Sequence, residues 1–170
     1  MLIIIATQTP LVFHEDNAYG FEAGSDAIAV QAKAQESLPY ITAELSEKTK
    51  SEISFEKVEL IRNCAFNTKS CNIKKDFRVF QDYKYGACYT FNYEEPAKYF
   101  TTRAGPLYGL RMLLVSNLSE YMSTTETAGV RVVVHDQNQF SFPDSFGYNS
   151  PTGTATSFSL RGVKLKRCIY

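Results

Sequence analysis

Four cysteines, Cys64, Cys71, Cys88 and Cys168, are the residues whose type and spacing first indicate chemistry. Four thiols allow three disulfide pairings, and the six residues between Cys64 and Cys71 are enough to form a small closed loop. A zinc site would need closer ligand pairs such as C-x2-C, or a paired H-x3-5-H, and the sequence has neither. We therefore expect disulfide chemistry and no metal site, with the pairing left open.

A nucleophilic dyad of Cys88 and His135 is the strongest catalytic hypothesis that the sequence offers. The competing interpretation is that Cys88 forms a disulfide while His135 ends a strand. We favour the second, because no neighbouring residue indicates a lowered thiol pKa. The sequence also lacks G-x-S-x-G, a glycine-rich phosphate loop and H-E-x-x-H. We predict no catalytic or cofactor-binding residues, no cofactor, and a protein that is not an enzyme.

Two acids, Asp136 and Asp144, follow His135 in the sequence and allow two interpretations. They could bind a cation, or titrate together with the histidine near neutral pH. Aspartate also commonly ends strands and begins turns. We favour the turn interpretation for both residues.

The compartment and partners of the chain are indicated by weaker signals. The triplet N-L-S at Asn117 is a candidate glycosylation site and weakly supports an oxidising compartment. The longest apolar run, residues 1–6, is too short for a secretory signal, and no run reaches the roughly 18 residues of a membrane helix. Lys+Arg and Asp+Glu are balanced at 18 each, which argues against nucleic acid as the main partner.

The elements expected to position these residues begin with an N-terminal helical half. Residues 1–24 are expected to be poorly ordered. A helix is expected to begin at a Ser25 cap and to be interrupted by Pro39. A second helical stretch is expected over residues 44–62, where apolar residues recur every third position and share one face: Phe55, Val58 and Ile61.

Strands are expected in the C-terminal half. Residues 85–92 form a β-prone aromatic run, residues 103–106 a turn, and residues 107–115 a mostly apolar run typical of a strand buried on both faces. Gly129 breaks the chain, and alternation over residues 130–134 predicts another strand. A last strand is expected over residues 154–166, with a β-bulge at Gly162 that keeps four apolar side chains on the core face: Phe158, Leu160, Val163 and Leu165.

Linked motifs over roughly residues 40–167 resemble the degenerin/epithelial sodium channel/acid-sensing ion channel family, and its degenerin branch in particular. The most specific is G-x-C-Y-T-F-N at residues 86–92. The others occur in the family's order and at its spacing: C-A-F-N-T-K-S-C at 64–71, D-F at 76–77, R-A-G-P-L-Y-G-L-R at 103–111, N-L-S-E-Y-M at 117–122, G-V-R-V-V-V-H at 129–135, F-P-D-S-F-G-Y at 142–148 and P-T-G at 151–153.

The resemblance implies an α+β fold that is part of a larger, hand-shaped ectodomain. Residues 25–75 would belong to an N-terminal helical finger portion that includes the Cys64–Cys71 loop. Residues 76–167 would supply antiparallel or mixed strands of the palm and the β-ball, and residues 168–170 form an atypical C-terminal end. The membrane helices that form the pore of such subunits are not in this chain, so we expect a truncated chain or an incomplete gene model.

The function implied is that of an amiloride-sensitive, sodium-selective channel subunit whose ectodomain couples an external stimulus to gating. Three subunits, identical or different, would surround the pore in the plasma membrane, with this part on the extracellular side and possible contacts to the extracellular matrix. The degenerin-like motifs favour mechanosensory or constitutive conduction. The alternative is a soluble secreted module or decoy that modulates full-length subunits, and a cysteine-dependent enzyme with a reactive Cys88 is a third hypothesis.

The resemblance also implies roles for individual residues. Cys64 and Cys71 would pair with each other. Cys88 would pair with a cysteine that follows the first membrane helix, but this sequence has no cysteine before residue 64. Cys168 falls outside the family pattern. Glu120 matches one acid of a pair that forms a proton-sensitive pocket in acid-sensing members, so we name it a possible gating-pocket acid. The paired carboxylate that would raise its pKa is absent, because the preceding residue is Ser119, and proton gating is not expected.

Overall fold

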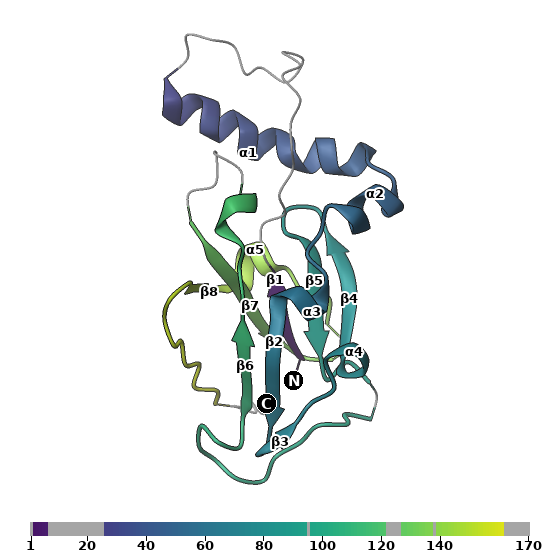
Figure 1. Ribbon diagram of the computed structural model, residues 1–170, viewed down its shortest axis with the longest axis vertical. Helices are drawn as coiled ribbons and strands as arrows, with labels where there is room; N and C mark the ends of the chain where they lie inside the picture. The colour runs from purple at the N-terminus through teal and green to yellow at the C-terminus, as the bar shows by residue number, and fades with distance from the viewer. Residues whose placement is uncertain (1, 7–25, 95, 122–126, 138, 162–170) are drawn as a thin grey trace, which may run out of the picture.

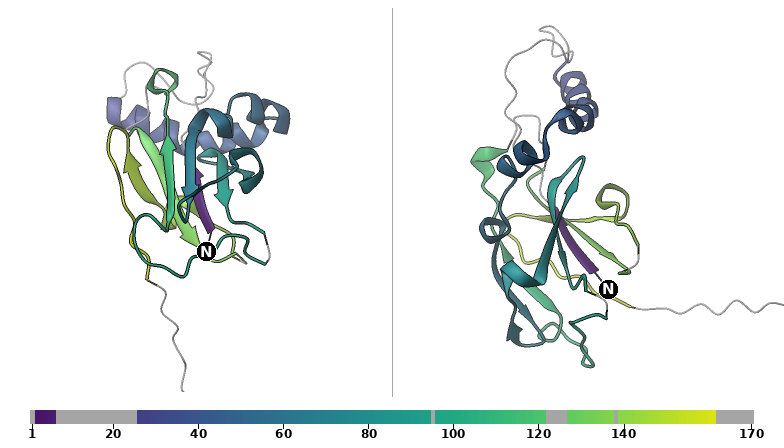
Figure 2. Two further views of the ribbon diagram at one scale, coloured as in Figure 1. Left: turned by 60° about the horizontal axis from the view of Figure 1, so that its bottom comes forward. Right: turned by 90° about the vertical axis from the view of Figure 1, so that its right-hand side faces the viewer.

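Two antiparallel β-sheets form the body of this computed structural model, which describes residues 2–6, 26–94, 96–121, 127–137 and 139–161. The first sheet has five strands in the order β4 (Phe77–Asp82), β5 (Gly86–Phe91), β1 (Leu2–Ala6), β7 (Gly129–His135) and β8 (Tyr148–Pro151). The second has three, in the order β3 (Lys69–Ser70), β2 (Ile61–Phe66) and β6 (Leu110–Leu114). The sheets lie as two layers, and a long helix lies beyond one end of them (Figures 1 and 2).

The main core packs between the two layers, and strand β5 is at its centre. Ala87, Tyr89 and Phe91 alternate along β5 and join one buried cluster with side chains of β2, β4 and β7. Cys88 points to the opposite face of the five-stranded sheet, where it packs in a second cluster with Tyr85 and Val133. Alternate residues of a strand point to opposite faces, so β5 is buried on both sides.

Six helical segments accompany the sheets in the described part of the chain. They are α1 (Ala27–Glu44), α2 (Glu47–Glu52), α3 (Lys57–Leu60), α4 (Ile73–Asp76), the 3-10 helix η2 (Leu118–Glu120) and α5 (Pro143–Phe146). The chain is therefore an α+β protein with antiparallel strands. No helix among the described residues combines the length and the apolar character that a membrane crossing requires.

Helix α1 is longer than the sequence predicted. The prediction that Pro39 interrupts the helix is wrong, because α1 continues through this residue to Glu44. The next turn is held by the Thr42 hydroxyl, which lies 2.8 Å from the Leu38 carbonyl oxygen and 3.0 Å from that of Tyr83 in the β4–β5 turn. The N-cap is Asp26, and the predicted cap Ser25 lies outside the described residues.

The single helical stretch predicted for residues 44–62 is wrong, because the structure divides it into α2, α3 and the start of β2. Ser46 caps α2, and Glu56 with Glu59 forms a capping box that starts α3. Phe55 lies between the helices, and Ile61 opens β2 opposite Leu114. The three-residue spacing of apolar residues therefore arose without a common helical face, since strand pairing with β6 determines the conformation at Ile61.

Three strand predictions also differ from the structure. Residues 2–6, expected to be poorly ordered, form central strand β1, which pairs with β5 on one side and β7 on the other. Strand β6 is not buried on both faces: Leu113 is 60% exposed, because only one face of the three-stranded sheet packs on the core and the other is turned to solvent. Residues 154–161 form no strand, and the bulge predicted at Gly162 lies outside the described residues.

Candidate functional site

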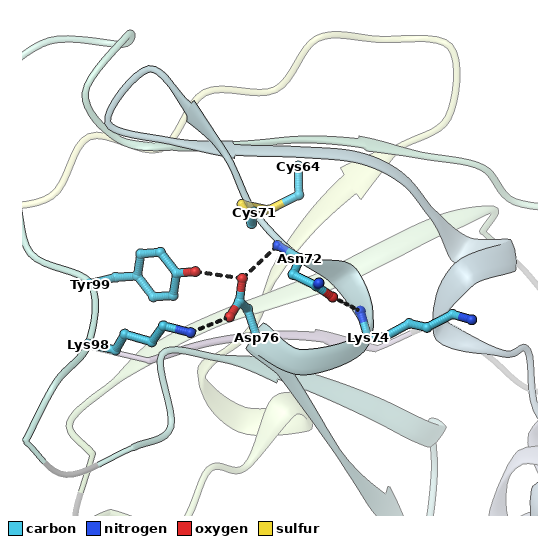
Figure 3. The surroundings of a disulfide bond; sticks show 7 residues. All are labelled: Cys64, Cys71, Asn72, Lys74, Asp76, Lys98 and Tyr99. Atoms are coloured by element: carbon cyan, nitrogen blue, oxygen red, sulfur yellow. Dashed lines mark hydrogen bonds and ion pairs between the residues drawn. A yellow bond between two sulfur atoms is a disulfide. The ribbon is translucent and has the colours of Figure 1, made fainter.

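A disulfide between Cys64 and Cys71 closes the turn between β2 and β3 (Figure 3). The Cα atoms are 5.3 Å apart, and the Cys71 N–H donates to the Cys64 carbonyl oxygen at 3.0 Å. The turn itself contains two consecutive residues with positive φ, Asn67 at 50° and Thr68 at 66°. Because non-glycine residues rarely adopt this conformation, the covalent closure holds a turn that the backbone alone would disfavour.

Helix α4 begins immediately after this disulfide, and two side chains cap the backbone N–H groups at its start. The Asn72 side-chain oxygen accepts hydrogen bonds from the backbone N–H groups of Lys74 and Lys75, each at 3.1 Å. The Asp76 carboxylate reaches back and accepts from the Asn72 N–H at 2.6 Å. This reciprocal capping fixes a four-residue helix, which would be too short to persist by propensity alone, and it fixes the direction of the Asp76 side chain.

The Asp76 carboxylate is buried, with a side chain only 3% exposed, and it collects three donors (Figure 3). One oxygen accepts from the Lys98 ammonium at 2.7 Å. The other accepts from the Tyr99 hydroxyl at 2.5 Å, in addition to the Asn72 N–H. Burial acts to raise the pKa of this carboxyl, but the bonds from Lys98, Tyr99 and the backbone favour the charged form and bring the pKa below its ordinary value.

The two donor side chains respond in the opposite direction. The hydrogen bond to the carboxylate raises the pKa of Lys98, which keeps its ammonium charged. Burial, followed by the bond to the same carboxylate, raises the pKa of Tyr99, which keeps its hydroxyl protonated. The charge states of all three groups are therefore stable through neutral pH.

Asn92 holds the loop that carries these donors. It follows β5 in the left-handed conformation, with φ of 61°, which asparagine tolerates better than most residues. Its side-chain oxygen accepts from the Tyr99 N–H and its amide donates to the Tyr99 carbonyl oxygen, both at 2.9 Å. Gln137, after β7, donates to the Asn92 carbonyl oxygen at 2.8 Å. The 92–99 loop is thus joined to the end of the five-stranded sheet.

We call Asn72, Asp76, Asn92, Lys98 and Tyr99 the Asp76 node. The Tyr99 ring packs on Phe66 of β2 and Phe91 of β5, with ring centroids 5.4 and 4.6 Å apart. The node therefore connects the disulfide-closed turn of the three-stranded sheet to the edge of the five-stranded sheet. Its chemistry is that of a fixed cross-link, because both carboxylate oxygens are engaged by donors. Among the described residues no group of three or more His, Cys, Asp or Glu side chains could hold a metal ion.

The catalytic hypothesis for Cys88 and His135 is wrong. On strand β1, which lies between them, Cys88 pairs with Ala6 and His135 pairs with Leu2. Four residues of strand separate the two positions by roughly 13 Å along its direction. Burial, with a smaller contribution from Asp82, raises the pKa of the Cys88 thiol. It is fully buried and is the free cysteine of the described residues, so the structure provides no reactive thiolate.

The acids near His135 make turn and ion-pair contacts. Asp136 accepts from the Gln137 N–H at 2.8 Å, and its carbonyl oxygen lies 2.7 Å from His135 Nδ1. Asp144 lies in the first turn of α5 and pairs with Lys84 at 2.6 Å. The two carboxylates therefore have separate partners, in agreement with the turn interpretation.

The remaining candidates from the sequence lie away from the node. Asn117 is exposed and is the N-cap of η2, and Glu120 ends the same 3-10 helix. The side chain of Glu120 and all of Cys168 lie outside the described part of the structure. Asp76 and Lys98 were not predicted as site residues. The available signals were the spacing of Asn72 and Asp76, typical of a helix cap, and the asparagine that ends the motif at 86–92.

Comparison with known proteins decides the family. Residues 9–169 match the family described as "amiloride-sensitive sodium channel", which is nearly the whole chain. The chain belongs to this family. Within it, the chain is 45% identical over 166 residues to degenerin-like protein unc-105 of Caenorhabditis elegans, covering 98% of the chain and 18% of the relative.

Two further relatives are degenerins by name. Degenerin unc-8 of C. elegans is 42% identical over 159 residues, covering 94% of the chain and 20% of the relative. Degenerin mec-4 of C. briggsae is 45% identical over 150 residues, covering 88% and 19%. The chain thus spans about a fifth of the length of these curated relatives. The resemblance expected from the linked motifs is confirmed, and it places the Asp76 node within the matched region of this channel family.

Proposed function

We propose that this chain is part of the extracellular domain of a degenerin-like, amiloride-sensitive and sodium-selective channel subunit, and that it couples an external stimulus to gating. The observation that carries this proposal is the match to the channel family over residues 9–169. The high identity to unc-105 over 98% of the chain supports the degenerin type. No finding favours the alternative of a secreted decoy.

The assignment to parts of the ectodomain follows from the same proposal. Helices α1 and α2 would be the finger portion, and the five-stranded sheet would be palm. The Cys64–Cys71 loop was expected in the finger portion, but its strands β2 and β3 pair in one sheet with β6, so we assign this three-stranded sheet to the β-ball. The antiparallel sheets and the position of α1 beyond their end support this division. Other subunits of the trimer and the membrane helices of the full-length protein would complete the channel at the plasma membrane.

The Asp76 node would be the mechanical link in this coupling. A stimulus that displaces one sheet is transmitted to the other only through contacts that do not yield. The node supplies three hydrogen bonds to a buried carboxylate, two of which join the end of α4 to the loop that follows β5. Asn92 and Tyr99 hold that loop by two further hydrogen bonds, and the disulfide closes the neighbouring turn between β2 and β3. Charge-assisted hydrogen bonds are roughly twice as strong as neutral ones, which makes this junction stiffer than ordinary loop packing.

The experiment is to sequence the native transcript across both ends of this region and to express its full product in oocytes. We expect a hydrophobic span of about 20 residues on each side. We also expect an inward sodium current, during stretch or without stimulus, that amiloride suppresses. Asp76→Asn should change the current per surface channel, whereas Gly109→Ala serves as a matched control because no atom lies within 4 Å of the added Cβ.

Two outcomes would contradict the proposal. One is a transcript that encodes no hydrophobic span on either side. The other is a full-length product that reaches the oocyte surface but carries no sodium current under stretch, acid or rest. An unchanged current in the Asp76→Asn channel would refute only the role of the Asp76 node.

A further inference from the structure

We propose that residues 140–142 form a strap that lifts from the five-stranded sheet, while α5, which follows the strap, stays in place. The strap and α5 lie on the outer face of this sheet, the face that points away from the three-stranded sheet (Figure 2). The Phe140 ring packs on Phe80 of β4, with ring centroids 6.4 Å apart. Phe80 in turn packs against the buried cluster that contains Cys88 and Val133. The strap is therefore a cover on the side of the sheet opposite to the main core.

The strap turns its aromatic residues to water and its serine inward. Phe140 and Phe142 are 72% and 52% exposed, whereas Ser141 between them is only 5% exposed. The Ser141 hydroxyl is buried and has no hydrogen-bond partner among the described residues. A buried polar group without a partner raises the free energy of the state that buries it. The closed position of the strap therefore carries a penalty that contact with water removes.

Few bonds hold the strap against the sheet. Within the described part of the chain, no backbone hydrogen bond reaches Phe140 or Ser141, and the strap belongs to no strand or helix. The Phe140 ring makes the ring contacts of this segment, with Phe80 and with Phe142 at a centroid distance of 5.1 Å. Segments with few buried apolar contacts and no protected backbone bonds are the ones that open locally.

Helix α5 is anchored where the strap ends, so it is the fixed side of the movement. The Arg131 guanidinium donates to the carbonyl oxygens of Pro143 and Asp144, each at 2.8 Å. Pro143 is fully buried, and the Asp144 carboxylate pairs with Lys84 of the β4–β5 turn at 2.6 Å. Opening is thereby confined to the three residues before α5.

The same anchor connects the strap with helix α1. The carbonyl oxygen of Tyr83, next to Lys84 in the β4–β5 turn, lies 3.0 Å from the Thr42 hydroxyl of α1. A displacement of α1 therefore reaches the turn, and the pair of Lys84 with Asp144 passes it to α5 and the strap. This last step rests on the proposed function, in which α1 receives the stimulus, whereas the opening of the strap does not depend on it.

The test measures whether the buried position in the strap becomes accessible. Ser141→Cys places a thiol of similar size there in the purified full-length protein, and mass spectrometry follows its reaction with a charged thiol reagent. Ser145→Cys, at an exposed position of α5, gives the rate at an open site, and the unsubstituted protein gives the background. We expect Ser141→Cys to react to completion but about tenfold or more slowly than Ser145→Cys, because it reacts only while the strap is lifted.

Two further substitutions make the test specific. Phe140→Ala removes the ring contacts with Phe80 and Phe142, and it should raise the rate at Ser141→Cys by about fivefold, the size expected from losing an aromatic pair. Phe146→Ala is the matched control, because this ring is similarly exposed, at 69%, but lies on the anchored helix. It should leave the rate unchanged.

Hydrogen exchange provides a second measurement that needs no cysteine. Ser141→Ala removes the hydroxyl without a partner, so it should slow amide exchange over residues 140–142 by about fivefold or more and leave exchange over β7 unchanged. Three results would overturn the inference: a Ser141→Cys thiol that never reacts, one that reacts as fast as Ser145→Cys, or faster exchange in Ser141→Ala. None of these measurements reads sodium current, so a strap that opens in a protein without current would support this inference while the proposed function failed.

Discussion

Replacing Asp76 by asparagine tests whether the Asp76 node stabilises the junction between the sheets. The amide has the shape of the carboxylate but carries one oxygen and no charge. That oxygen can still accept from the Asn72 N–H and the Tyr99 hydroxyl, which share one carboxylate oxygen in the native protein. The new NH2 group then faces Lys98, whose side chain is half exposed and can turn to water.

The expected loss is about 2 kcal/mol in the free energy of unfolding. Hydrogen bonds to a charged group contribute roughly 1.5–3 kcal/mol and neutral ones roughly 0.5–1.5 kcal/mol, so each of the two retained bonds loses about 1 kcal/mol. The contact with Lys98 adds little, because an exposed ammonium is well solvated and screened. Tyr99→Phe, which removes a single hydroxyl, should cost about 1 kcal/mol.

Urea unfolding followed by far-ultraviolet circular dichroism measures these differences, with equal m-values as the check on two-state behaviour. The pH dependence gives a second test. The pKa of Asp76 is lower in the folded chain than its ordinary value, so its stabilising contribution is present above about pH 4 and is lost as the carboxylate protonates below it. The difference between wild type and Asp76→Asn should therefore shrink on acidification.

Two results would refute this reasoning. One is an Asp76→Asn protein within about 0.5 kcal/mol of wild type at neutral pH, which is the usual range for surface substitutions. The other is a difference that grows below pH 4. Lys98→Gln is the matched control, and it should destabilise the protein less than Asp76→Asn.

Three further predictions concern other contacts. Replacing both Cys64 and Cys71 by alanine opens a loop of sequence separation 7 and should lower the free energy of unfolding by about 2.4 kcal/mol from chain entropy. Thermal unfolding measures this loss, and a wild-type unfolding midpoint that does not change with reductant would contradict it. Gly129→Ala should lower the free energy of unfolding by roughly 2 kcal/mol or more, because the added Cβ would lie 2.4 Å from a β8 carbonyl oxygen. Gly109→Ala, whose added Cβ has no atom within 4 Å, is the control in the same urea assay. Arg131→Lys should speed amide hydrogen exchange over residues 143–149, because the guanidinium donates to two backbone carbonyls and one side chain around α5. Mass spectrometry measures this exchange, and an unchanged rate would show that these bonds do not hold α5.

Strands β5 and β7 were predictable because their residues agree with their environment at every level. The aromatic and β-branched run at 85–92 contains β5, and the valine-rich run at 130–134 lies within β7. Both strands are buried, so local propensity and tertiary packing favour the same conformation. The motif at 86–92 also indicated the family, because it stands in a fixed order with seven others.

The failures occurred where a neighbour in space determined the outcome. The spacing of Phe55, Val58 and Ile61 resembles a helical face, but pairing with β6 draws Ile61 into a strand. Residues 2–6 form a central strand because they pair with β5 on one side and with β7 on the other, and both strands lie far along the chain. Pairing of this kind depends on distant segments, and a local window of sequence does not contain that information.

The sequence by itself determined the family, the α+β class, the lack of catalytic motifs and the cysteine spacing that permits a small closed loop. These follow from residue types and from distances along the chain. The tertiary structure alone decided that Asp76, Lys98 and Tyr99 meet, and that Cys88 and His135 do not. Two of the three donors to Asp76, Lys98 and Tyr99, lie 22 and 23 positions further along the chain. Only the packing of the two sheets brings them to this carboxylate and buries it enough for those bonds to matter.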